Sequence, residues 1–405
     1  MIAARSSALA GLRTGVLIAC ALLLSGPAAG YAERKPLECP RQSLRDAVNH
    51  ATDTDYTIRF TGVCQGPIVI RTNGLTLTGV GTAIIDGGGA DAVTISGARG
   101  VSLTNLEVRN GLNGILGLNG AHVTLTGVHA HDNGVFGVSL QTTSSALLAD
   151  VTTTDNGVHG LDLETGSAAT VTDTFIASNN RVFGINVNGS AITFSLAKVS
   201  VSGNALGIQI ATGANAFISD AATVITVQNN RSTGLTVVSG AQLVSFGGTI
   251  NAFGNPSNGV SVNSKGGFDL NAGSTLNSFN NGQGVLLQEA SVMTVFNNPQ
   301  FSGVPGLSTI NTHKNTGSGI RVQSGSTLTL SNQAQVQSTH NAQMGLVADN
   351  GVGVTLVNST ITDNTGLDLQ LTFGARADLQ TLTFGTYTCD ATVLVRGSSG
   401  ILCPH

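Results

Sequence analysis

Short runs in which apolar and polar residues alternate recur along most of the chain. Examples are Leu75-Thr-Leu-Thr78, His122-Val-Thr-Leu-Thr126 and Thr327-Leu-Thr-Leu330. A period of two residues is typical of strands that bury one face, and no stretch of the repeats sustains the period of 3.6 residues that a helix requires. The pattern therefore predicts many strands of roughly three to five residues, separated by turns rich in Gly, Asn and Ser.

A single motif recurs throughout, consisting of an Asn, a few variable residues, and a Gly followed by alternating apolar residues. Eleven copies have the following Asn and Gly residues: Asn110 and Gly114, Asn133 and Gly137, Asn156 and Gly160, Asn180 and Gly184, Asn204 and Gly207, Asn230 and Gly234, Asn255 and Gly259, Asn281 and Gly284, Asn315 and Gly319, Asn341 and Gly345, and Asn364 and Gly366. Such short strands cannot bury a face alone, but stacked copies share a continuous core. We therefore expect a solenoid with one turn per copy, and an added loop or irregular coil between Gly284 and Gly319, which are 35 residues apart.

The repeated Asn has a structural explanation. Asn tolerates the left-handed backbone conformation of a tight corner. Asn side chains stacked in successive turns also form hydrogen-bonded amide ladders along the axis. We therefore predict that the Asn column stabilises the solenoid.

Several early segments resemble the opening coils of right-handed parallel β-helix proteins of the pectate-lyase-like superfamily. They are Gly66-Pro-Ile-Val-Ile70, Ala83-Ile-Ile-Asp-Gly-Gly-Gly89 and Val101-Ser-Leu-Thr-Asn-Leu-Glu-Val-Arg-Asn-Gly111. The resemblance implies an all-β, single-domain right-handed parallel β-helix solenoid, which we expect over residues 66–383. It does not specify an activity, because that superfamily includes lyases, hydrolases, epimerases and adhesins.

Both ends of the predicted solenoid carry candidate caps. Ser43–Ala51 begins with a good N-cap residue and has apolar residues on one side, so we expect a short capping helix within an N-terminal cap at residues 33–65. Such a helix would cover the first turn and block edge-to-edge association. Residues 384–405 are expected to form a C-terminal cap.

The first 32 residues are typical of a secretory signal peptide. Arg5 and Arg13 precede the apolar run Val16–Leu24, and small residues lead to a cleavage site before Glu33. Cys20 lies in a segment similar to a lipoprotein attachment site, so lipidation is the alternative to simple cleavage. We therefore expect a protein that is secreted, periplasmic or exposed at the cell surface.

Four cysteines remain in the mature chain and form one pair near each end. Cysteines in an exported chain favour disulfides. We predict the disulfides Cys39–Cys64 and Cys389–Cys403, which would hold the two termini of the solenoid. The chain has no CxxC pair, so the spacing does not support a zinc site.

The composition narrows the range of functions. Only 10% of the residues are charged and the net charge is -4, which provides no dense basic face for a nucleic acid. The chain has no Trp and three Tyr, so it offers few aromatic platforms for sugars. We expect no transmembrane segment in the mature chain, and a monomer.

Candidate chemistry is concentrated on the strand that follows Gly160. Asp162 and Glu164 fall on one face of it, roughly 6.5–7 Å apart, where two carboxylates can act as acid and base in glycoside hydrolysis or bind Ca²⁺. His159 is the third catalytic candidate. The predicted substrate-binding residues in adjacent turns are Ser139, Gln141, Arg181, Asn186 and Asn188. The alternative is structural: outward polar residues keep a sheet soluble, and His159 aligns with Phe136 and Phe183.

The motifs of the superfamily's enzymes are absent. The acidic Ca²⁺ cluster of the lyases and the Asn-Thr-Asp, Gly-His-Gly and Arg-Ile-Lys segments of the polygalacturonases do not occur. We therefore predict an exported protein of the cell envelope or extracellular space that binds a polysaccharide or a surface protein through its long polar faces, with no metal and no cofactor. The alternative is a polysaccharide lyase or glycoside hydrolase that acts through Asp162 and Glu164.

Overall fold

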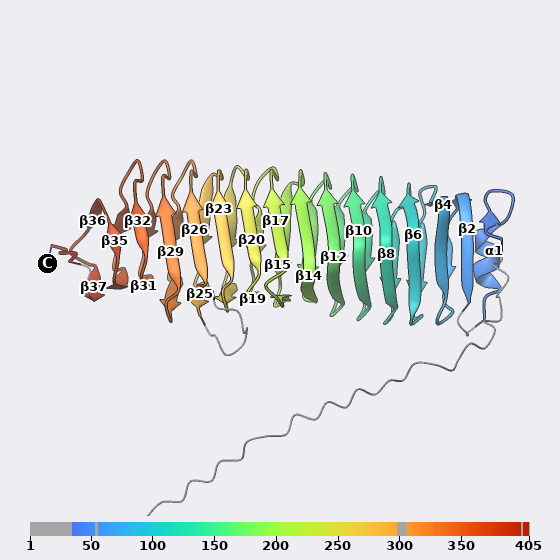
Figure 1. The fold of residues 1–405 in the computed structure, drawn as a ribbon, viewed down its shortest axis with the longest axis horizontal. Coiled ribbons are helices and arrows are strands. Elements are labelled where there is room, and N and C mark those ends of the chain that lie inside the picture. Colours follow the sequence, from blue (N-terminus) through green and yellow to red (C-terminus); the bar gives the residue numbers. More distant parts are fainter. Residues whose placement is uncertain (1–34, 53–55, 298–305, 398–399, 405) are drawn as a thin grey trace, which may run out of the picture. The chain divides into compact units, whose positions relative to one another are not determined.

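Parallel strands stacked in successive coils make up almost all of the chain that the structure describes (Figure 1). The structure is a computed structural model that describes residues 35–52, 56–297, 306–397 and 400–404. The predicted signal peptide, with Cys20, lies outside the described residues. Every strand pairing is parallel, and the strands form two sheets. The predicted all-β parallel β-helix is confirmed.

A 14-stranded sheet contributes one short strand per coil, where the motifs predicted eleven turns. Each strand pairs with the next one in this order: β3 (Ile68–Ile70), β5 (Val93–Ser96), β7 (Ile115–Leu118), β9 (Phe136–Leu140), β11 (His159–Leu163), β13 (Phe183–Asn188), β15 (Leu206–Ala211), β18 (Leu235–Val237), β21 (Asn258–Val262), β24 (Gln283–Leu287), β27 (Ile320–Val322), β30 (Leu346–Ala348), β33 (Leu369–Leu371) and β36 (Tyr387–Cys389). These are the strands that contain or follow the repeated Gly, together with strands of earlier and later coils that lack the full motif.

A 23-stranded sheet forms the rest of each coil. Its first strands are mostly long: β1 (Leu37–Glu38), β2 (Thr57–Gln65), β4 (Thr76–Asp86), β6 (Val101–Arg109), β8 (His122–His131), β10 (Ser145–Thr154), β12 (Ala168–Ser178) and β14 (Ala191–Ser202). Several contain one residue with a positive φ, such as Asn105 (54°), Asp173 (53°) and Leu196 (53°), where the strand turns a corner.

After β14 the 23-stranded sheet continues as two rows, because β14 pairs with both β16 and β17. One row contains β16 (Asn215–Ile218), β19 (Gln242–Phe246), β22 (Gly267–Asn271), β25 (Val292–Phe296), β28 (Thr327–Ser331), β31 (Gly353–Val357), β34 (Arg376–Gln380) and β37 (Leu394–Gly397). The other contains β17 (Val224–Gln228), β20 (Thr249–Phe253), β23 (Thr275–Phe279), β26 (Thr309–His313), β29 (Gln335–Thr339), β32 (Thr360–Thr362) and β35 (Thr383–Phe384).

Alternation along the strands places the apolar residues in one continuous core, which extends from Leu44 to Ile401. Within β12, for example, Val171, Phe175 and Ala177 are fully buried. Each coil covers the apolar residues of the next coil, so the short strands are stabilised by stacking and not individually.

The Asn column forms the predicted ladder. The backbone N–H and the Nδ2 amide of Asn156 both donate to Oδ1 of Asn180, at 3.1 and 2.9 Å. The pattern continues with small variations through these residues: Asn133, Asn156, Asn180, Asn204, Asn230, Asn255, Asn281, Asn315, Asn341 and Asn364. Because all of these residues except Asn364 are buried, the ladder satisfies polar groups that water cannot reach.

The left-handed corner, however, belongs to the residue before each ladder Asn. Asp155 (φ 56°) and Asn179 (φ 57°) hold this conformation next to Asn156 and Asn180. Asn110 is also a corner residue (φ 54°) and lies outside the ladder, which begins where the Gly111 N–H donates to Asn133 Oδ1 at 3.0 Å. The left-handed corner and the amide ladder, both predicted for the repeated Asn, therefore belong to two adjacent residues.

The repeated Gly is explained by the ladder beside it. A Cβ on Gly160 would lie 2.8 Å from Asn180 Nδ2 and 2.7 Å from Gly184 O, closer than side-chain atoms pack. In the last copy, the assignment of Gly366 as the repeated Gly is wrong. Leu369 pairs with Leu346, so Asp368 takes the position that Gly345 holds one coil earlier. In β33 the outward residue is therefore Gln370, which pairs with Val347, and not Asp368.

The predicted capping helix and both predicted disulfides are present. Helix α1 (Leu44–Asn49) begins after Ser43, whose Oγ accepts from the Asp46 N–H at 3.1 Å, and buries Leu44 and Val48. The disulfides Cys39–Cys64 and Cys389–Cys403 are both formed.

The strands reach further than the predicted limits of residues 66–383. β2 precedes that range, and β36 and β37 extend both sheets beyond it to Gly397. The long interval between Gly284 and Gly319 contains the connection from β25 to β26, in which residues 298–305 lie outside the described chain. In the described ranges no helix is long and apolar enough to span a membrane.

Candidate functional site

Asp162 lies in the middle of β11 on the outer face of the 14-stranded sheet, because the flanking Leu161 and Leu163 belong to the core. Its Oδ2 accepts from Ser139 Oγ at 3.2 Å, and its Oδ1 accepts from Asn186 Nδ2 at 2.9 Å. Ser139 and Asn186 are its register partners in β9 and β13. The structure therefore brings three of the predicted site residues into one hydrogen-bonded group.

The outward polar residues of this sheet were expected to face solvent, yet Asp162 and Ser139 are both 0% exposed. Adjacent strands are about 4.8 Å apart, so a short outer side chain is covered by its hydrogen-bonded neighbours in the coils before and after it. Burial raises the pKa of Asp162 to about 6. The hydrogen bond from Asn186 opposes this rise, and the charge of Glu164 adds to it.

Glu164 is the half-exposed member of the carboxylate pair. Its side chain makes no hydrogen bond or ion pair with any residue that the structure describes. Asn188 is also half-exposed, whereas Gln141 donates from Nε2 to Ser139 Oγ at 3.2 Å. A ligand on this face would therefore contact Glu164, Gln141 and Asn188, and not Asp162.

Gln209 extends the group by one coil, because its Nε2 donates to Asn186 Oδ1 at 3.2 Å. It was not among the predicted substrate-binding residues. Its position in the outward column after Gly207, next to Asn186, was the sequence signal that could have identified it.

His159 is part of an aromatic stack. Its ring lies between those of Phe136 and Phe183, with centroid distances of 5.4 and 4.8 Å. Its Nδ1 accepts from the Phe183 N–H at 3.2 Å, which requires the neutral form with the proton on Nε2. Burial lowers the pKa of His159 to about 4. No hydrogen bond joins His159 to Asp162 or Glu164 in the described structure, so the geometry corresponds to the structural alternative.

Arg181 is exposed at the corner that follows Asn180. Its backbone N–H donates to Asn156 O at 3.0 Å, and its guanidinium has no partner among the residues described. The structure therefore does not connect Arg181 to the group around Asp162.

A separate charged cluster lies on the 23-stranded sheet, on β6 and β8. His131 Nε2 is 2.9 Å from Glu107 Oε1, and its Nδ1 is 2.7 Å from Asp132 Oδ2. The His131 ring stacks on His129 at 4.3 Å, and Arg109 Nη1 is 3.2 Å from Glu107 Oε1. Because its carboxylates already have partners within the cluster, we assign this cluster a structural role.

A second polar group occupies the outer face of the 14-stranded sheet further along the chain. Gln323 Nε2 donates to Gln288 Oε1 at 2.9 Å, and Arg321 Nε donates to Gln323 Oε1 at 2.8 Å. Arg321 Nη2 also lies 3.2 Å from Asp349 Oδ2. All four residues are half-exposed. They occupy outward positions of the strands near the repeated Gly, but the sequence alone did not single them out.

The chemistry that this face offers is hydrogen bonding. Within the ranges described, no group of three or more His, Cys, Asp or Glu side chains is arranged to hold a metal ion. On this face the carboxyl group with a raised pKa is that of Asp162. Asp162 is buried, and both of its carboxylate oxygens already accept hydrogen bonds. Half-exposed amides held by mutual hydrogen bonds are the accessible groups.

Comparison with known proteins agrees with this architecture. The family model described as "Right handed beta helix region" matches residues 68–224. No curated protein matches the sequence.

Among solved structures, the chain is similar to the A-module of the mannuronan C-5 epimerase AlgE6 of Azotobacter vinelandii. The identity is 15%, the match covers 87% of this chain and 93% of that chain, and the TM-score is 0.37. It is also similar to PfbA, a surface adhesin of Streptococcus pneumoniae, with 9% identity, 90% and 91% coverage and a TM-score of 0.23. At these TM-scores the similarities carry no argument about activity. The coil architecture is that of a right-handed parallel β-helix, and the family match over residues 68–224 agrees with it.

Proposed function

We propose that this protein is exported and binds an uncharged polysaccharide along the outer face of its 14-stranded sheet. The observation that carries the proposal is the pair of hydrogen-bonded amide groups on that face, one around Gln141 and Asn186 and the other around Gln288 and Gln323. Between β9 and β30 the face spans roughly 40 Å at the usual strand spacing, enough for several sugar residues.

The chemistry of this face favours a hydroxyl-rich ligand over a protein. Protein interfaces centre on apolar and aromatic side chains, whereas these outer positions are mainly amides and hydroxyls. Their side chains are already oriented by each other, which lowers the entropy lost on binding. Glu164 and Asp349 add negative charge, opposed mainly by Arg321, so a polyanion would be repelled.

The test is binding to a panel of neutral polysaccharides, with acidic polymers for comparison, measured by affinity electrophoresis. We expect a neutral polymer to bind and the double variant Gln288→Ala, Gln323→Ala to lose most of that binding. The matched control is Gln335→Ala, Gln337→Ala, which removes two outer glutamines from β29 on the other sheet. The proposal is wrong if no neutral polymer binds, or if both pairs of substitutions have the same effect.

A hydrolase or lyase acting through Asp162 and Glu164 is the second candidate, since the pKa of Asp162 is raised to about 6, as an acid catalyst at neutral pH requires. It needs Asp162 to become accessible on substrate binding. Assays for reducing ends and unsaturated products, with Asp162→Asn and Glu164→Gln as controls, distinguish it: turnover that both variants abolish supports the enzyme, and binding without turnover supports the primary proposal.

A further inference from the structure

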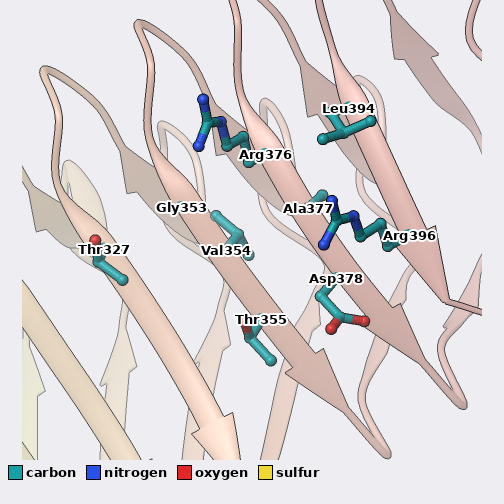
Figure 2. A pocket seen from close by; sticks show the side chains of 9 residues that line it. All are labelled: Thr327, Gly353, Val354, Thr355, Arg376, Ala377, Asp378, Leu394 and Arg396. Atoms are coloured by element: carbon teal, nitrogen blue, oxygen red, sulfur yellow. The ribbon is translucent and has the colours of Figure 1, made fainter.

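A hollow lined by two arginines lies on the outer face of the 23-stranded sheet, near the C-terminal end of the described coils. It has a volume of about 250 Å³ and lies over β28, β31, β34 and β37. Figure 2 shows Arg376 and Arg396 leaning from their strands toward the preceding coil. The hollow lies on the 23-stranded sheet, whereas the amide groups lie on the 14-stranded sheet. It is therefore a separate feature from the proposed polysaccharide face.

The two guanidinium groups are available to a ligand. Neither guanidinium group has a hydrogen bond or ion pair with any residue in the described ranges. Asp378 pairs in register with Arg396, yet its side chain is joined only to Gln380, at 3.4 Å. An arginine presents a planar set of N–H donors that matches a carboxylate or sulfate. The register places the two Cα atoms roughly 8 Å apart, which suits one oxyanion between the guanidinium groups.

Gly353 lines the hollow, and packing does not explain why a glycine stands at this position. A Cβ at this position would be 3.6 Å from both Cγ2 and Oγ1 of Thr327, an ordinary contact, and its φ is not positive. Glycine inside a strand weakens the strand and often marks a site where a ligand approaches the backbone closely. The column in which it lies reads Thr327, Gly353, Arg376 and Leu394, so the missing side chain opens the space beside Arg376.

We propose that this hollow binds a small polyhydroxylated anion, a sugar unit that carries a carboxylate or sulfate group. The oxyanion lies between Arg376 and Arg396, and its hydroxyl groups donate to the Asp378 carboxylate and contact the Thr327 and Thr355 hydroxyls. The volume is below the roughly 300–1,000 Å³ of pockets for larger molecules, so the site holds one unit. Exposed Leu394 provides an apolar wall for the sugar ring.

Isothermal titration calorimetry on the full chain tests the site with three probes: D-glucuronate, D-glucose 6-sulfate and uncharged D-glucose. We expect at least one anion to bind, with glucose at least about ten-fold weaker, and the stronger anion identifies the preferred oxyanion. Arg376→Gln and Arg396→Gln should each raise Kd about ten-fold or more, because each removes charge-assisted hydrogen bonds. Gly353→Val should also weaken binding by filling the hollow.

Arg99→Gln is the matched control, because Arg99 is an exposed arginine at the opposite end whose guanidinium has no partner in the described chain. It should leave Kd unchanged, and circular dichroism should show that all four variants are folded. The inference is overturned if neither anion binds, if glucose binds equally well, or if Arg99→Gln weakens binding as much as the substitutions in the hollow. Any of these results would leave the proposed function of the other sheet untouched.

Discussion

The carboxylate of Asp368 accepts two hydrogen bonds from Asn364, one from the backbone N–H at 3.1 Å and one from the side-chain amide at 2.9 Å. Its second oxygen accepts from the N–H groups of Gly385 and Thr386, at 3.1 and 2.8 Å. Burial raises the pKa of Asp368, but these hydrogen bonds outweigh it and hold the pKa below its ordinary value. An aspartate therefore terminates the asparagine ladder at the position of the repeated glycine. No ladder Asn follows, so the side chain has room there.

Replacing Asp368 with Ala should destabilise the C-terminal coils. The change leaves the N–H donors of Asn364, Gly385 and Thr386 without their acceptor, and we expect a loss of about 2–4 kcal/mol. Asp368→Asn, which keeps one acceptor oxygen, should lose less. Urea unfolding measures the loss, and hydrogen exchange should localise it to the last coils. Asp378→Ala, at the same end, should change stability by less than about 0.5 kcal/mol. Equal effects of the two alanine substitutions would contradict this role for Asp368.

Two glycine substitutions should have opposite effects. In Gly234→Ala the new Cβ would lie 2.7 Å from Gly259 O and 2.8 Å from Asn255 Nδ2, so the ladder must shift, with an expected loss of about 1–3 kcal/mol. In Gly353→Ala the Cβ makes only ordinary contacts, so reduced freedom of the unfolded chain should raise stability by about 0.4–1 kcal/mol. Thermal unfolding of both variants provides the comparison, and a loss at Gly353 as large as at Gly234 would rule out the clash as the cause.

The pH dependence of stability should contain two opposing contributions. The folded pKa of His159 is about 4, below its ordinary 6.5, so its contribution is fully present above pH 6.5 and is lost as the pH falls toward 4. The folded pKa of Asp162 is about 6, above its ordinary 3.8, so its contribution is present below pH 3.8 and is lost as the pH rises through 6. Between pH 4 and 6 the two slopes offset each other.

Single substitutions separate these contributions. His159→Phe, which restores the residue type of the adjacent coils, should give a protein that loses about 2 kcal/mol relative to wild type as the pH rises from 4 to 6. Asp162→Asn should gain a similar amount relative to wild type over the same range. Guanidinium unfolding at half-unit pH intervals measures both differences. A constant difference from wild type across this range, for either variant, would show that the residue does not titrate as stated.

The Cys39–Cys64 disulfide should be the more important of the two. It closes 25 residues and Cys64 is buried in the core, so Cys39→Ala with Cys64→Ala should lose about 3 kcal/mol or more. Cys389–Cys403 closes 14 residues and lies at the edge of the core, so its removal should cost less. Hydrogen exchange in β2 and β4, compared with β34 and β37, reports each effect. A larger loss from the C-terminal pair would contradict the ranking.

Alternation of apolar and polar residues, together with the recurrence of Asn and Gly, predicted a solenoid, and the resemblance to parallel β-helix proteins implied its parallel form. The N-cap and apolar residues of Ser43–Ala51 predicted the capping helix, and the positions of four cysteines predicted the two disulfides. These features depend on local periodicity and spacing, which the chain carries in its own order of residues. The last copy was misaligned by two residues because Gly366 fits the motif, whereas the register of β30 and β33 places Asp368 opposite Gly345. Register depends on pairing between coils, which the motif does not encode.

The sequence by itself determined which side chains of one strand share a face, because side-chain direction follows from strand alternation. Only the tertiary structure decided which of them a ligand can reach. Asp162 and Glu164 have the same chemistry and lie two residues apart, yet hydrogen bonds from the adjacent coils bury Asp162 and leave Glu164 half-exposed. Likewise, Gly353 and the two arginines come from three different coils, and their juxtaposition arises only when those coils stack. Exposure and juxtaposition depend on neighbours distant in sequence, so they are decided by how the coils pack.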